Sequence, residues 1–192
     1  ETMALFQAAG YDIIIVETVG VGQSEVAVAD MVDFFLVLLL AGGGDDLQGI
    51  KKGIIELADM IGINKSDGDN IARAERAAAE YRNALLILTP HSAVWHPPVV
   101  TISGAHNKGL DTLWAHIMGY RDKLTATGDF DRRRQRQAVE WMRELIGNRL
   151  MESMRQNPAV AAELPLLEAE VRDGHMIPTR AADRVLGLMG LT

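Results

Sequence analysis

A run of four polar residues, Asn64-Lys65-Ser66-Asp67, directly follows a short apolar segment, 60–63, that we predict to be a strand. A carboxylate at Asp67 can accept two hydrogen bonds from guanine, one from N1–H and one from the exocyclic amine, and adenine does not supply this pair of donors. Asn64 can bond the base edge and tie the loop together, and the aliphatic stem of Lys65 can lie on the purine face. A polar strand-to-helix turn, with Asp67 at the helix start, would use the same residues.

A second polar loop, Ser103-Gly104-Ala105, follows another predicted strand, 99–102. In guanine-nucleotide proteins a Ser-Ala loop at this place offers backbone N–H groups to the guanine carbonyl. This chain carries Gly104 where alanine is commoner. The position of the loop after a strand favours the guanine interpretation of the first loop.

A third group of residues follows the predicted strand 12–16. Glu17 stands at the carboxyl edge of that strand, where an α/β sheet places an acidic group that faces magnesium. Gly20 would let the backbone approach a terminal phosphate closely. The pair Gly20-x-Gly22 does not continue into a dinucleotide-binding fingerprint, because Glu25 occupies the place of the third glycine.

The segment 42–52 combines three glycines with the acidic pair Asp45-Asp46. Glycines favour a mobile loop, and acidic residues suit a helix N-terminus, so the segment alone is typical of a capped helix.

The elements that must position these residues alternate along the first two thirds of the chain. Nearly continuous apolar runs predict strands at 12–16, 34–39, 60–63 and 99–102. Between and after them, helical spacing marks three apolar stripes: Leu47/Ile50/Ile54/Leu57/Ala58, Ile71/Ala74/Ala78/Tyr81/Leu85 and Leu110/Leu113/Trp114/Ile117. This alternation predicts an α/β fold with a mostly parallel sheet.

The chain beyond about residue 125 is predicted to be entirely helical. A long helix is expected over 130–155, Asn157 is a candidate N-cap before Pro158, and Thr179 is a candidate cap for a last helix through Leu188. The basic cluster 131–136 is interpreted as the solvated start of the long helix rather than as a contact for phosphate or an acidic partner.

Composition excludes several classes of function. The 192 residues carry 19 basic and 26 acidic side chains, a net charge of −7, which argues against binding nucleic acid or an anionic membrane over the whole surface. The absence of cysteine excludes disulfides, thiolate metal sites and cysteine nucleophiles. The five histidines show neither metal-ligand spacing nor a neighbouring carboxylate pattern, and we predict no site from them.

Taken together, these strings resemble the MeaB/ArgK family of P-loop GTPases. Residues 17–25 resemble the family's switch II signature, with Glu17 in place of the usual Walker B aspartate. Residues 43–51 are similar to its additional switch III loop, and residues 64–69 to its guanine-specificity loop. The later features keep the family's order: Trp95, Pro97-Pro98, Ser103 and the helical tail.

The resemblance implies a P-loop NTPase-type sheet and a GTP-binding, GTP-hydrolysing metallochaperone. Such a protein assists cofactor loading and protection of adenosylcobalamin-dependent methylmalonyl-CoA mutase, with GTP/GDP and Mg²⁺ as cofactors. The mutase and a second copy of the chain are the implied partners, without nucleic acid or membrane, and the implied location is cytoplasmic. The implied catalytic residues are Glu17, Gly20, Gln48 and Lys51, with Glu17 also at the metal. The implied nucleotide-binding residues are Asn64, Lys65, Asp67, Ser103, Gly104 and Ala105.

One element of the family pattern does not occur in this sequence, the glycine-rich P-loop that ends in Gly-Lys-Ser/Thr. Because the sequence starts at Glu1, we interpret 1–125 as the C-terminal part of a GTPase domain without its P-loop portion. Residues 126–192 are then a helical extension and dimerisation arm, and the fragment alone is expected to be inactive.

Two alternatives stay open. The chain could be a non-hydrolysing binding or dimerisation module on a GTPase-like fold. It could also be a GTPase chaperone for another metal-cofactor enzyme, although nickel-insertion GTPases usually carry Cys/His ligands and this chain has no cysteine.

Overall fold

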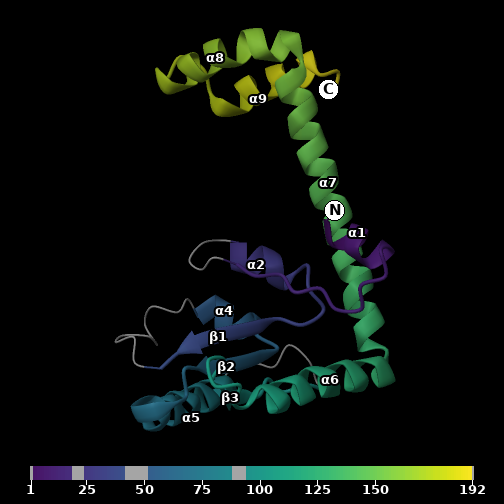
Figure 1. The fold of residues 1–192 in the computed structure, drawn as a ribbon. Helices are drawn as coiled ribbons and strands as arrows, with labels where there is room; N and C mark the ends of the chain where they lie inside the picture. The colour runs from purple at the N-terminus through teal and green to yellow at the C-terminus, as the bar shows by residue number, and fades with distance from the viewer. Residues whose placement is uncertain (1, 19–23, 42–51, 88–93, 192) are drawn as a thin grey trace. The chain divides into compact units, whose positions relative to one another are not determined.

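The computed structural model describes residues 2–18, 24–41, 52–87 and 94–191. The chain divides into two compact units, Glu1–Gln137 and Ala138–Thr192. The first unit holds the sheet, and the second is built from helices (Figure 1).

The described sheet has three parallel strands in the order β1-β2-β3. They are β1 Leu36–Leu40, β2 Met60–Asn64 and β3 Val99–Thr101. The central strand β2 is buried over its first four residues, as expected for a strand covered on both faces. The parallel sheet is as predicted, and its three strands lie within two residues of the predicted segments 34–39, 60–63 and 99–102.

Helices pack on both faces of this sheet, although Leu38 and Leu40 of β1 stay more than half exposed. Since side chains alternate along a strand, Ile61 and Ile63 face one side and Gly62 faces the other. The first side forms the main core with Ala29, Ile55, Ala74 and Ala78. On the second side, a Cβ added at Gly62 would lie 3.8 Å from the side chain of Leu113 in α6. The flanking elements are α1 Thr2–Ala8, α2 Ser24–Ala29, α4 Lys52–Leu57, the 3₁₀ turn η1 Gly68–Asn70, α5 Ile71–Ile87 and α6 Leu110–Thr127.

The predicted strand at 12–16 is wrong. Residues 13–18 have no regular secondary structure, and the side chains of Ile13 and Ile15 are 57% and 88% exposed. A strand needs a hydrogen-bonded neighbour, and the segment does not pair with the described sheet, so its apolar composition alone does not make it a strand. Of the apolar stripe expected over 47–58, Leu47 and Ile50 lie outside the described residues, while Ile54 and Leu57 belong to α4.

The second unit contains the end of α7 Asp129–Gln156, with α8 Pro158–Arg172 and α9 Pro178–Leu188. Its core is Val160, Leu167 and Val185. The predicted cap at Asn157 is confirmed, because its side chain accepts hydrogen bonds from the backbone N–H groups of Ala159 and Val160.

The predicted cap at Thr179 is wrong. The N-cap residue of α9 is Ile177, and Pro178 takes the first helical position. Proline suits that position because its fixed φ matches the helix and its missing N–H would have no helical partner there.

The basic cluster 131–136 lies at the start of α7, and all of its residues except Arg133 are exposed, as the interpretation of a solvated helix start predicts. The cluster also makes contacts that this interpretation did not include. Arg133 forms an ion pair with Asp59 at 3.0 Å and also donates to the hydroxyl of Tyr120. Arg134 pairs with Asp33, its Nε donating at 2.7 Å, and Gln137 donates to the carbonyl of Val32 at 2.9 Å. No helix in the described part of the chain is long and apolar enough to cross a membrane.

Candidate functional site

Two loops meet at the carboxyl edge of the sheet. The first, 64–67, continues from β2, and the second, 103–108, follows β3. The strands are paired in parallel with Ile63 opposite Thr101, so both loops leave the sheet at the same edge. A backbone bond of 2.9 Å, from the N–H of Ser66 to the carbonyl of Ile102, joins them. This edge is where α/β sheets bind ligands.

The side chain of Asn64 ties the two loops together. Its Oδ1 accepts from the backbone N–H of Lys65 at 2.8 Å and from the backbone N–H of Gly104 at 3.1 Å. The carbonyl of Lys65 in turn accepts from the side-chain amide of Asn70 at 2.8 Å. These bonds hold Lys65 in the left-handed region, at φ 58°, which residues other than glycine seldom adopt.

Asp67 carries the carboxylate of the site. Its Oδ2 accepts a hydrogen bond from the hydroxyl of Ser103 and lies 3.4 Å from Nδ1 of His106. The hydrogen bond from Ser103 lowers the pKa of Asp67; burial opposes this shift, while the side chain of His106 and the charge of Lys108 support it. The other oxygen, Oδ1, has no hydrogen-bond partner among the described residues, and the side chain is 26% exposed. The site therefore presents an ionised carboxylate with a free acceptor.

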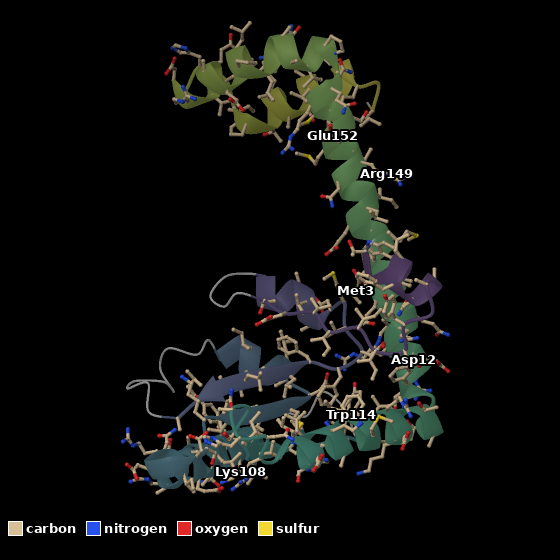
Figure 2. All side chains as sticks on the ribbon, in the orientation of Figure 1. Met3, Asp12, Lys108, Trp114, Arg149 and Glu152 are labelled. Atoms are coloured by element: carbon tan, nitrogen blue, oxygen red, sulfur yellow. The ribbon has the colours of Figure 1, made fainter. Side chains whose placement is uncertain are left out.

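The second loop is closed on itself. Ser103 is fully buried, and its backbone exchanges two hydrogen bonds with Lys108, of 2.9 and 3.0 Å; Figure 2 labels Lys108. Gly109 follows at φ 72°, and a Cβ there would lie 2.6 Å from the carbonyl oxygen of Thr101, so only glycine fits. These constraints fix where the hydroxyl of Ser103 meets Asp67.

The loop's own hydrogen bonds change what it can offer a ligand. We expected backbone N–H groups at Ser103, Gly104 and Ala105 to face a base carbonyl. The N–H of Ser103 bonds to Lys108, and that of Gly104 bonds to Asn64. Within the described residues, the N–H of Ala105 is the one of the three without a partner.

Of the residues expected to act on phosphate and magnesium, the structure describes Glu17. Glu17 is exposed in the irregular segment 13–18, so its expected place at the edge of a strand is wrong. Gly20, Gln48 and Lys51 lie outside the described residues. The described part of the chain holds no group of three or more His, Cys, Asp or Glu residues that could form a metal site.

The contact of His106 with Asp67 is not among the features predicted from the sequence, which indicated no site at the histidines. Its ring lies against both Asp67 and Ser103, although 39 residues separate it from Asp67 (106 − 67). Only the pairing of β2 with β3 brings them together, so no local pattern in the sequence signals this contact.

Comparisons with known proteins show which family model and which proteins this chain resembles. The family model described as "Methylmalonyl Co-A mutase-associated GTPase MeaB" matches residues 1–159. A Caulobacter vibrioides protein named as a GTPase is 54% identical over 191 residues, which is all of this chain and 58% of that protein. The Escherichia coli "GTPase ArgK" is 53% identical over 144 residues, covering 75% of this chain and 44% of that protein.

A mouse protein, "Methylmalonic aciduria type A homolog, mitochondrial", is 46% identical over 186 residues, covering 97% of this chain and 45% of that protein. Among solved structures, "Crystal structure of LAO/AO transport system kinase" matches with a TM-score of 0.79 and 38% identity, over 98% of this chain and 60% of that one. This likeness confirms the predicted fold class. The chain spans about half the length of the curated relatives it matches.

Proposed function

This chain belongs to the MeaB family of P-loop GTPases, and we propose that its two-loop edge recognises guanine in a GTP-binding, GTP-hydrolysing chaperone of adenosylcobalamin-dependent methylmalonyl-CoA mutase. The observation that carries the proposal is the carboxylate of Asp67. It is held at Oδ2 by Ser103, leaves Oδ1 free and lies at the ligand-binding edge of the sheet.

The chemistry of this edge fits a guanine base. An ionised carboxylate only accepts hydrogen bonds, and guanine presents two parallel donors, N1–H and the 2-amino group, where adenine presents an acceptor at N1. The free N–H of Ala105 suits the guanine carbonyl, and the exposed stem of Lys65 suits the purine face. The Oδ1 of Asn64 already accepts hydrogen bonds from backbone N–H groups of both loops, so we assign Asn64 to holding the loops together rather than to contacting the base.

Hydrolysis is proposed to depend on Glu17, Gly20, Gln48 and Lys51. Magnesium in phosphate sites takes one or two carboxylates, with water and phosphate oxygens completing its shell. A single exposed carboxylate at Glu17 fits that donor set. Bound Mg²⁺ supplies charge neutralisation at the phosphates, and the amide of Gln48 and the ammonium of Lys51 would serve as polar groups toward them.

The partner is proposed from family membership. The matching model's description names association with methylmalonyl-CoA mutase, and the mouse relative's name refers to methylmalonic aciduria. We extend this partner to the present chain, together with cofactor loading and protection, a cytoplasmic location and a homodimer formed through residues 126–192.

Replacing Asp67 tests the base assignment in the full-length protein. Asp67→Ala removes charge-assisted hydrogen bonds, so GDP and GTP affinities measured by calorimetry should fall by about ten- to a hundredfold. The melting temperature should stay nearly unchanged, because the side chain is partly exposed.

A matched variant sharpens this test. Asp67→Asn keeps the shape but replaces one acceptor oxygen by an N–H₂ donor, so xanthosine diphosphate, which has a carbonyl at the 2-position, should gain relative to GDP. Unchanged GDP affinity in both variants would contradict the assignment. Guanine binding without turnover of GTP would instead support the non-hydrolysing alternative.

A further inference from the structure

His106 contacts the carboxylate of Asp67 and the hydroxyl group of Ser103 that donates to it. Its ring nitrogen Nδ1 lies 3.4 Å from Oδ2 of Asp67 and 3.2 Å from the hydroxyl oxygen of Ser103. Its backbone N–H also donates to that hydroxyl oxygen at 3.3 Å. The hydrogen-bonded bridge between Ser103 and Lys108 closes the loop that carries the ring.

The hydrogens available around Nδ1 determine whether this ring nitrogen donates or accepts a hydrogen bond. The hydroxyl of Ser103 has one hydrogen, and it is donated to Asp67. The remaining polar atoms around Nδ1 are therefore acceptors, namely the Ser103 oxygen and the Asp67 carboxylate. A favourable contact requires the hydrogen of the imidazole on Nδ1, in the neutral ring or in the imidazolium.

The number of hydrogen-bond donors determines how freely the carboxylate plane of Asp67 can rotate. The terminal torsion of an aspartate side chain is broad, so a single hydrogen bond from Ser103 would leave the plane of the carboxylate free to turn. A second donor from a different direction restricts this rotation. Guanine needs a fixed plane, because its two donors are parallel and both must meet the carboxylate.

We propose that His106 is a positioning residue that fixes the carboxylate plane of Asp67 and thereby raises the selectivity of the site for bases that carry a 2-amino group. This inference rests on the proposed guanine-binding function. His106 itself does not touch the base; it acts through Asp67. The charge and hydrogen bond of His106 also favour the ionised, acceptor-only form of Asp67, in the same direction as Ser103 and Lys108.

The test compares GDP with inosine diphosphate, which lacks only the 2-amino group, in the full-length protein. His106→Phe keeps a ring but removes the donor, whereas His106→Asn places an amide nitrogen near the position of Nδ1. With calorimetry, we expect His106→Phe to bind GDP about three- to tenfold more weakly and to lose at least about threefold of the GDP-over-IDP preference. His106→Asn should keep both within about twofold.

His175→Phe, at an exposed histidine in the helical unit, is the matched control and should change neither affinity. If the unmodified protein shows no preference for GDP over inosine diphosphate, the proposed function itself fails. If it shows the preference and His106→Phe retains it, the guanine site stands and the role of His106 is overturned. Equal losses for both nucleotides in the Phe and Asn variants would make His106 a structural residue and would also overturn the inference.

Discussion

Strand β2 has an aspartate beyond each end, and the two carboxylates differ in their exposure and in how many of their oxygens accept hydrogen bonds from the protein. At the amino end, Asp59 accepts from the backbone N–H of Phe35 at 2.8 Å and from Arg133 at 3.0 Å. Its side chain is 13% exposed. Beyond the carboxyl end, Asp67 has Ser103 and His106 on one oxygen and is twice as exposed, at 26%.

The surroundings of Asp59 show what a structural carboxylate looks like. Trp95 donates to its carbonyl at 2.8 Å, and Tyr120 packs edge-on against Trp95 while sharing Arg133 with Asp59. Burial raises the pKa of Tyr120 well above its ordinary value. Burial is the largest single effect on Arg133 and lowers its pKa, but the charge and hydrogen bond of Asp59 and those of Tyr120 together outweigh it, so the pKa is raised.

The difference between the two ends follows the general behaviour of parallel sheets. The amino end of β2 is closed by packing, so a charge there must be matched by another charge of the same chain. The carboxyl end faces the loops, where ligands bind, and a carboxylate there can keep one oxygen for a ligand. Exposure and unused hydrogen-bonding capacity therefore separate Asp67, the proposed recognition residue, from the structural Asp59.

The largest expected effect comes from breaking the pair at the amino end. Asp59→Ala leaves Arg133 uncompensated and removes the acceptor for Phe35, so the free energy of unfolding should fall by about 3 kcal/mol. GDP affinity of the folded protein should stay within about twofold of the unmodified value. Denaturant unfolding and calorimetry measure the two quantities.

The double variant Asp59→Asn/Arg133→Met provides the control for this pair. It removes both charges, so it should be more stable than Arg133→Met alone, which leaves the carboxylate unpaired. A large loss of GDP affinity in folded Asp59→Ala would contradict the separation of the two ends.

A smaller effect is expected at Asn64, which lies at the same end of β2 as Asp67 but has its side-chain oxygen hydrogen-bonded within the protein. Asn64→Ala loses the bonds to Lys65 and Gly104, so stability should fall by about 1 kcal/mol and GDP affinity should fall as well. Asp67→Ala, by contrast, should lower GDP affinity and leave stability nearly unchanged. If Asn64→Ala left stability unchanged, the tie between the loops would not contribute to the fold.

The sequence predicted those elements of the fold that are determined by residues close to one another in the chain. The continuous apolar character of 60–63 indicated a central strand, and the spacing of Ala74, Ala78 and Tyr81 indicated the buried side of α5. The cap at Asn157 was equally local, since it depends on two following backbone N–H groups. The segment 12–16 has the same apolar character as β2 but no pairing neighbour in the described sheet, and sequence pattern does not distinguish these cases.

For the proposed site, the sequence predicted the positions along the chain but not the contacts. The predictions that Asp67 and Ser103 follow strands are confirmed, and Asn64 is the last residue of β2. The use of the N–H groups of Ser103 and Gly104 by the protein, and the approach of His106 to Asp67, depend on how β2 pairs with β3. Such long-range pairing has no signature in either loop alone.

The smallest effect is expected at Gly104, where the sequence departs from the commoner alanine. A Cβ there would lie 3.8 and 3.9 Å from the side-chain oxygen and nitrogen of Asn64, which is ordinary contact distance, and the backbone is outside the left-handed region. Gly104→Ala should therefore leave GDP affinity within about twofold, and it should raise stability by about 0.5 kcal/mol because the unfolded chain loses freedom.

Gly109→Ala is the matched control five residues on, with φ 72° and a Cβ position 2.6 Å from the carbonyl oxygen of Thr101. That variant should lose stability by more than Gly104→Ala gains, because the backbone carbonyl cannot move aside cheaply and alanine is strained at this φ. Thermal melts of the two variants measure these opposite changes in stability. If Gly104→Ala weakened GDP binding tenfold while its melting temperature rose, the absence of a side chain at this position would be a requirement of the ligand. The carboxyl end of β2 would then be more closely fitted around its ligand than its hydrogen bonds indicate.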